Sequence, residues 1–171
     1  MPEGFLSFTE VALDRAGERL PGIDRSAMAM VLLLHRVASA IVYDLESTVH
    51  RPAGWSWSAF RMLFTLWICG PQEAGRCAEL AGMSRAAVSS LAKTLEAAGL
   101  VQRTDDPRDR RTVVLSLTAD GSDRLAETFG THNRRERDWA GLLTAEEVAT
   151  LNGILGKLAG AAQEQDWVRR R

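Results

Sequence analysis

The stretch that decides the fold runs from Arg76 to Leu117 and reads RCAELAGMSRAAVSSLAKTLEAAGLVQRTDDPRDRRTVVLSL. Its pattern predicts a short helix, a tight turn, a second helix and then a two-stranded ribbon with a charged tip. Ala78 is small enough for two helices to cross closely, and Gly82 supplies the permissive backbone of the turn. Val88 then packs the second helix against the first. This order of elements predicts a winged helix-turn-helix.

The two helices of this motif have recognisable ends. Ser84 is expected to cap the second helix, because its hydroxyl accepts a hydrogen bond from an otherwise unpaired amide of the next turn. That helix is therefore expected to run from Arg85 to Ala98, and Gly99 is a residue type that ends helices. The supporting helix before the turn is expected over residues 73–81.

The ribbon is expected from two β-rich runs, residues 100–104 and 112–117, around the loop DDPRDRR. The run from Gly82 to Gly121, GMSRAAVSSLAKTLEAAGLVQRTDDPRDRRTVVLSLTADG, closely resembles the DNA-binding core of the MarR family. Members of that family are bacterial repressors and activators that work as homodimers and often respond to small molecules or oxidants. The resemblance implies a mainly α fold with a small β-hairpin wing, in an intertwined helical homodimer that binds double-stranded DNA.

A recognition helix in a major groove turns its first turn and its solvent face toward base edges. On the predicted helix, the residues at these positions are Ser84, Arg85, Ala86, Ser89, Ser90 and Lys93. Arg85 can form hydrogen bonds with guanine or with a phosphate, and Ser89 and Ser90 can donate hydrogen bonds to either of these. Ala86 can make an apolar contact with a thymine methyl group.

The wing adds a second set of DNA contacts. The resemblance implies that Arg111 enters the minor groove while Asp109 holds its guanidinium, with Arg108 and Arg110 near phosphates. Arg103, which follows the recognition helix, is a further candidate for a phosphate contact. The plainer alternative is that this loop is a solvated hairpin tip, because Asp-Pro with charged neighbours is a common turn composition.

Charge and composition limit the classes of function. A net charge of −1 excludes a chain that coats nucleic acid indiscriminately, so DNA binding must come from locally placed cations. Six cations face four anions between Ser84 and Leu115, which makes this segment weakly basic. No elbow, phosphate-loop, dinucleotide or zinc-protease motif is present, so neither an enzyme nor a cofactor is expected.

Helices are expected on both sides of the motif, at residues 7–20, 24–49, 56–69, 118–139 and from Thr144 onward. Asp24 and Thr118 are expected N-caps, Ser56 is expected to start its helix, and Thr144 with Glu147 is expected to form a capping box. We treat residues 1–171 as a single domain, with residues 56–117 as its winged helix-turn-helix and residues 5–54 and 118–171 as dimerisation helices. The last helix has an apolar stripe that is expected to pack on another chain or on the N-terminal helices. The stripe comprises Val148, Leu151, Ile154, Leu155, Leu158 and Ala162.

The resemblance also implies an effector crevice, in which His35, Trp57, Arg61 and Phe64 would hold a small aromatic or anionic molecule. The alternative is that the aromatic residues form only core, as an aromatic stripe at helical spacing usually does. Cys69 and Cys77 are both expected to be small buried residues, and His35, His50 and His132 are too dispersed in sequence to predict a metal site.

The sequence also gives expectations for where the protein is located and for its class of function. The N-terminus lacks the basic and apolar regions of a signal peptide, and no run of 18 or more apolar residues occurs, so a cytoplasmic protein without a membrane partner is expected. The sequence favours a DNA-binding regulator, most simply a repressor. A winged-helix scaffold for protein contacts alone and a structural helical bundle are the alternatives.

Overall fold

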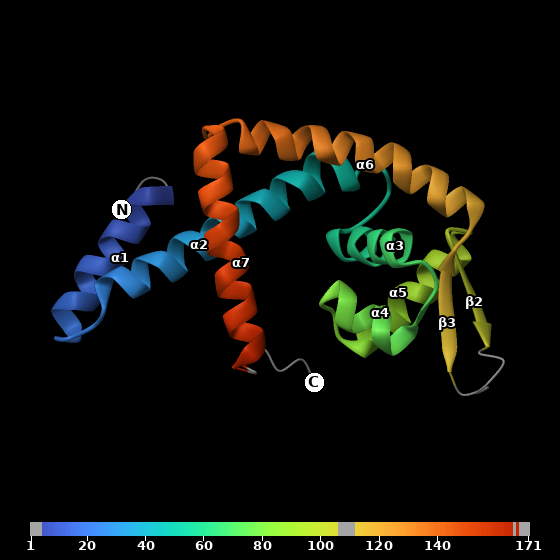
Figure 1. Ribbon diagram of the computed structural model, residues 1–171, viewed down its shortest axis with the longest axis horizontal. Coiled ribbons are helices and arrows are strands. Elements are labelled where there is room, and N and C mark those ends of the chain that lie inside the picture. The colour runs from blue at the N-terminus through green and yellow to red at the C-terminus, as the bar shows by residue number, and fades with distance from the viewer. Residues whose placement is uncertain (1–4, 106–111, 166, 168–171) are drawn as a thin grey trace. The chain divides into compact units, whose positions relative to one another are not determined.

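The computed structural model describes residues 5–105, 112–165 and 167, which are mainly helical with one small sheet (Figure 1). The chain forms two compact units, Met1–Asp44 and Leu45–Arg171. The first contains α1 (Phe5–Arg19) and nearly all of α2 (Arg25–Leu45). Asp24 caps α2 as expected, because its carboxylate accepts a hydrogen bond of 2.8 Å from the Ala27 amide. Arg25 joins the two helices by donating to the Leu13 carbonyl at 3.0 Å.

The predicted helix over 24–49 ends differently from the expectation. Its α-helical part stops at Leu45, and a π-helical turn, η1, covers Glu46–His50. The Arg51 amide donates to the Glu46 carbonyl at 2.9 Å, so the ring closes over five residues instead of four. This wider turn accompanies the burial of His50, which has no exposed surface.

The second unit contains the winged helix-turn-helix and the two C-terminal helices. Its elements are α3 (Trp57–Cys69), β1 (Gln72–Glu73), α4 (Ala74–Ala81), α5 (Arg85–Ala97), β2 (Val101–Asp105), β3 (Val113–Leu117), α6 (Ala119–Ala140) and α7 (Ala145–Glu164). The core lies between α3, α4, α5, the sheet and the start of α6. Its fully buried members include Met62, Leu63, Val88, Leu100, Leu115 and Leu125.

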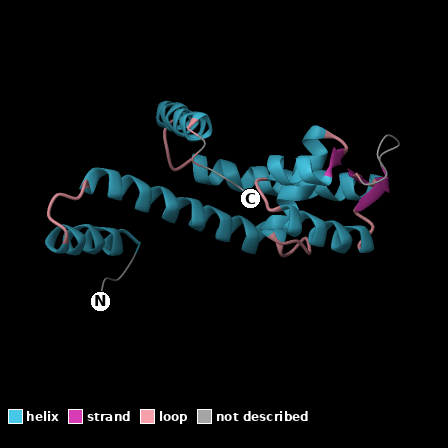
Figure 2. Cartoon of the chain, turned by 90° about the horizontal axis from the view of Figure 1, so that it is seen from below, coloured by secondary structure: helices cyan, strands magenta, loops and turns pink. Residues whose placement is uncertain are grey.

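The sheet has three antiparallel strands in the order β1-β3-β2, where a two-stranded ribbon was predicted (Figure 2). Val101 pairs with Leu117 across β2 and β3, and Gln72 pairs with Leu115 across β1 and β3. The prediction was also wrong for Glu73, which lies in β1 and not in the supporting helix. A strand of two residues has no periodicity that a sequence pattern can reveal.

Side-chain caps fix several of the helix starts, as predicted. The hydroxyls of Ser56, Ser84 and Thr118 each accept a hydrogen bond from the amide three residues on. Thr144 and Glu147 form the expected capping box at the start of α7. These bonds satisfy amides that have no partner inside the helix, so each helix has a defined first residue.

Gly121, in the first turn of α6, lies directly against the backbone of Leu100. A Cβ atom added at Gly121 would lie only 2.0 Å from the Leu100 carbonyl oxygen. The Thr118 amide donates to this same carbonyl at 3.1 Å. Because Gly121 has no side chain, the first turn of α6 can lie in contact with Leu100, which is three residues beyond the end of α5.

Two helices carry large exposed apolar surfaces. On α7, Leu151, Ile154, Leu155 and Leu158 are all exposed. The stretch Arg25–His50 has a mean hydropathy of 1.6 in its most apolar window, none of which is buried. By length and composition this stretch is the one candidate membrane span among the described helices, although the core helix of a soluble protein or a signal sequence passes the same test.

Candidate nucleic-acid interface and the adjoining groove

The turn between α4 and α5 has the geometry of a helix-turn-helix. Gly82 ends α4 in the left-handed conformation with a φ of 64°, and the Met83 amide donates to the Ala78 carbonyl at 2.8 Å. The inner face of α5 is closed by Val88, which is 0% exposed, and Leu95, which is 4% exposed. The orientation of α5 is thus fixed by its buried face, and its opposite face is left to solvent.

That opposite face holds the residues predicted to contact DNA. Arg85, Ala86, Ser89, Ser90 and Lys93 are all exposed on α5, and Ser84 is exposed just before it. The Ser84 hydroxyl accepts the Ala87 amide at 3.1 Å, which leaves its own proton available as a donor. The Arg85 guanidinium lies beside the start of α4, where a Cβ added at Gly75 would be 3.7 Å from Arg85 Nε. The face is therefore a row of short polar side chains between two cations.

The wing begins beside this helix. Arg103 projects from β2 and forms an ion pair of 3.6 Å with Glu96 near the end of α5. The pair links the base of the wing to the recognition helix. The predicted wing-tip contacts, Arg108, Asp109, Arg110 and Arg111, lie outside the described residues.

A groove of about 300 Å³ lies within the second unit, between α3, the end of α4 and the middle of α6. Of the residues predicted to bind an effector, Trp57, Arg61 and Phe64 line it, whereas His35 is not among its lining residues and lies exposed on α2. The Arg61 guanidinium donates to the carbonyls of Ala81 and Gly82 at the end of α4. The full lining is Trp57, Phe60, Arg61, Phe64, Thr65, Leu80, Ala81, Phe129, His132 and Glu136.

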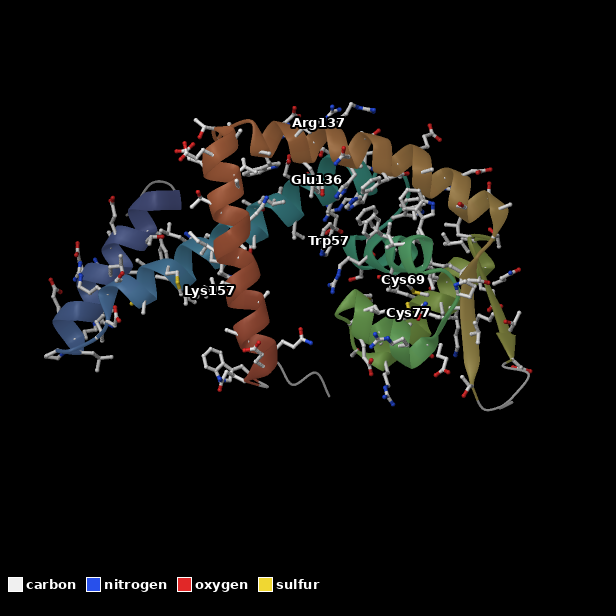
Figure 3. All side chains as sticks on the ribbon, viewed as in Figure 1. Trp57, Cys69, Cys77, Glu136, Arg137 and Lys157 are labelled. Atoms are coloured by element: carbon white, nitrogen blue, oxygen red, sulfur yellow. The ribbon has the colours of Figure 1, made fainter. Side chains whose placement is uncertain are left out.

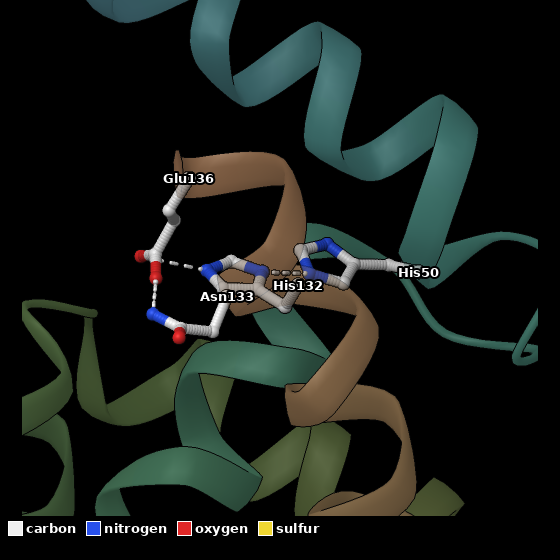
Figure 4. A network of polar contacts seen from close by, with 4 residues as sticks. All are labelled: His50, His132, Asn133 and Glu136. Carbon is white, nitrogen blue, oxygen red and sulfur yellow. Dashed lines mark hydrogen bonds and ion pairs between the residues drawn. The ribbon is translucent and has the colours of Figure 1, made fainter. Parts of the chain in front are cut away.

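One wall of the groove belongs to a polar network that sequence reasoning missed, with two buried histidines and two more exposed partners (Figure 4). His50 Nε2 lies 2.9 Å from His132 Nδ1, and His132 Nε2 lies 3.1 Å from a Glu136 oxygen. The other Glu136 oxygen accepts from the Asn133 side-chain amide at 2.8 Å. The two histidines are 82 residues apart in the chain, so their sequence separation gave no signal of this contact.

The histidines are embedded among aromatic rings. The His50 ring stacks on Phe60 with centroids 4.2 Å apart and also contacts Trp57 at 5.4 Å. Burial, and then the neighbouring His132, lower the pKa of His50 from 6.5 to about 4. His50 is therefore neutral at physiological pH.

The cysteine prediction was correct for one residue and wrong for the other. Cys77 is fully buried in α4, and burial together with nearby Cys69 raises its pKa to about 11. Cys69, the last residue of α3, is exposed, although it lies close to Cys77 (Figure 3). Across the described ranges, no group of three or more His, Cys, Asp or Glu side chains is placed to hold a metal ion.

Comparison with known proteins agrees with this architecture. The model of the MarR family matches residues 55–113, from the start of α3 to the returning strand of the wing. An uncharacterized HTH-type transcriptional regulator of Bacillus subtilis, YwaE, is 32% identical over 137 residues, which are 80% of each chain.

Solved structures share the fold. A mutant E. coli MarR complexed with operator DNA has a TM-score of 0.71 at 22% identity, covering 84% of this chain and 96% of that one. Bordetella bronchiseptica BpsR, whose structure concerns the regulation of DNA binding by 6-hydroxynicotinic acid, has a TM-score of 0.69 at 24% identity, covering 74% and 96%. Since the relative in B. subtilis and the family model agree with the helix-turn-helix and wing, this chain belongs to the MarR family of transcriptional regulators, whose members are not enzymes.

Proposed function

We propose that this regulator is a homodimeric repressor that binds a pseudo-palindromic duplex through α5 and the wing. The observation that carries the proposal is the division of α5 into a buried face, which fixes its orientation, and an exposed polar and cationic face. A dimer would place two such helices about 34 Å apart, one turn of DNA, and would repress by excluding polymerase from the site.

Two exposed surfaces support a homodimer. The apolar stripe of α7 and the apolar side of Arg25–His50 are each too extensive to face water alone. A second copy that covers both would account for them, as the resemblance to intertwined dimers implies. We also propose a cytoplasmic location, because a transcriptional regulator must reach the DNA that it binds.

A small effector is proposed to act at the groove beside Trp57, Arg61 and Phe64. The groove joins α3 and α4 of the DNA-binding portion to α6, so a ligand there contacts both. Binding would favour a dimer geometry in which the two recognition helices no longer match the DNA spacing. The control of BpsR by 6-hydroxynicotinic acid supports this kind of regulation.

Selection of duplexes from a random pool tests DNA binding directly. An inverted repeat is expected, and affinity for it, measured by fluorescence polarisation, should fall steeply with added salt as phosphate counterions are released. No enrichment of any sequence, with weak and salt-insensitive binding, would instead support a protein-interaction scaffold.

Two substitutions separate the roles of helix and wing on the selected duplex. Arg85→Ala should weaken binding by roughly 1–3 kcal/mol and relax the preference at particular bases. Arg111→Ala should weaken binding to all sequences alike. Lys157→Ala, which removes an exposed cation from α7, is the matched control. If neither arginine variant differed from that control, both assignments would be wrong.

A further inference from the structure

The groove between α3 and α6 has walls suited to a flat ring. Phe60 and Phe64 lie with ring centroids 5.7 Å apart, and Phe129 on α6 lies 5.2 Å from Phe64. Trp57 adds a fourth aromatic ring. Aromatic faces carry negative charge density, so such walls accept either an apolar ring or a cation.

Two hydrogen bonds hold the polar wall of the groove in place. The Glu136 carboxylate accepts from Asn133 Nδ2 on one oxygen and lies 3.1 Å from His132 Nε2 with the other. His132 is in turn held by His50, whose Nε2 lies 2.9 Å from His132 Nδ1. The Glu136 carboxylate is therefore fixed in position at the wall of the groove.

The groove also contains the positively charged side chain of Arg61, which is held by hydrogen bonds to the end of a helix. Arg61 directs its guanidinium at the Ala81 and Gly82 carbonyls, which form the negative end of α4. On α6, Glu136 lies on the side toward Trp57 and Arg137 lies on the opposite side (Figure 3). Glu136 is the one carboxylate among the residues that line the groove.

We propose that the groove recognises a flat aromatic cation whose N–H group donates to the Glu136 carboxylate. The inference rests on the proposed effector site and specifies the chemical class of its ligand. An aromatic acid of the same shape would bring its own carboxylate beside Glu136, and an uncharged amide would keep the ring contacts but lose the ionic attraction.

Three isosteric probes test this assignment: 2-naphthamidinium, 2-naphthamide and 2-naphthoate, titrated into the full-length protein by calorimetry. The cation is expected to bind about tenfold more tightly than the amide, with the acid weakest. Glu136→Gln should abolish the preference for the cation, whereas 2-naphthamide should still bind, which shows that the groove is intact. Glu127→Gln, an exposed carboxylate on the same helix that does not line the groove, should change neither.

The possible results are distinct. A preference for 2-naphthoate, equal binding of all three probes, no binding of any, or a cation preference that survives Glu136→Gln would each overturn the assignment. Binding to the selected duplex is measured on the same preparations. Intact DNA binding without a cation preference rejects only the ligand class, whereas a Glu136-dependent cation preference without DNA binding supports the ligand class and rejects the proposed function.

Discussion

His50 is a titratable side chain with no exposed surface, held between aromatic rings and a second histidine. Its Nε2 atom lies 2.9 Å from His132 Nδ1, while its own Nδ1 atom is buried without a hydrogen-bond partner among the described residues. A second proton on this ring would go to Nδ1, where no acceptor receives it. Protonation must therefore oppose folding.

Acidification should destabilise the protein through His50. Its folded pKa is about 4, below the ordinary 6.5, so the unfolded chain binds the extra proton first and stability falls as pH drops from about 6.5 toward 4. Between about pH 7 and pH 5 the loss is about 2 kcal/mol in the free energy of unfolding. Urea titrations at the two pH values measure it.

His50→Gln should flatten this pH dependence, because glutamine keeps a donor for His132 but does not titrate. His35→Gln, at an exposed histidine of α2, is the control and should retain the full slope. Equal slopes in the wild type and in His50→Gln would show that another group is responsible.

Individual residues were predictable where their role is local. Ser84, Thr118 and Thr144 act on amides three residues away, so their capping could be deduced from sequence. The contact of His50 with His132 depends on how η1 and α6 pack, which no local pattern encodes. Cys69 was assigned to the core from its apolar character, although its position at a helix end exposes it.

Among the elements, the start of α6 depends on a single glycine. Gly121→Ala would place a methyl group within 2.0 Å of the Leu100 carbonyl oxygen, so α6 or the segment after α5 must shift. We expect a loss of about 1–3 kcal/mol in the free energy of unfolding, although alanine is otherwise the better helix former. Thermal or urea unfolding measures this.

Gly130→Ala, in the same helix, is the matched control. Its added methyl would lie 3.8 Å from a flexible Arg134 atom, and no other contact within 4 Å is found, so stability should rise by roughly 0.5–1 kcal/mol. If both substitutions stabilised the protein alike, the close approach of α6 to Leu100 would be disproved.

Several helices were predicted well because a side-chain cap, a helical apolar period or a glycine at the end marks them in the sequence. The supporting and recognition helices differ from expectation by one residue at most. The π-turn of η1 was missed because its sequence continues the helical pattern of α2. The short strand β1 was missed because its pairing with β3 joins residues more than forty positions apart.

At the scale of the whole molecule, the apolar stripe of α7 is the surface on which assembly is proposed to depend. Leu155→Gln combined with Leu151→Gln should shift the protein toward monomer in sedimentation velocity, because both exposed leucines would lose their apolar contact with the second copy. Operator affinity should fall in parallel, since each monomer would hold only one half-site.

Lys157→Gln tests whether any change to α7 has this effect. Its side chain is exposed away from the apolar stripe by helical spacing, so the dimer should persist. A double leucine variant that sediments like the wild type would remove α7 from the interface. The sequence predicted this stripe, because helical periodicity reveals an apolar face, but periodicity does not identify what covers it.

The short strand β1 has a consequence for how this protein tolerates changes in length. Gln72 and Glu73 pair with β3, and Ala74 is already the first residue of α4. No loop residue therefore separates the sheet from the helix-turn-helix. One residue inserted between Glu73 and Ala74 would either bulge out of the chain or tilt the helices away from the wing. Natural variation in loop length should therefore accumulate in the turn over residues 141–143, where no such pairing constrains the chain.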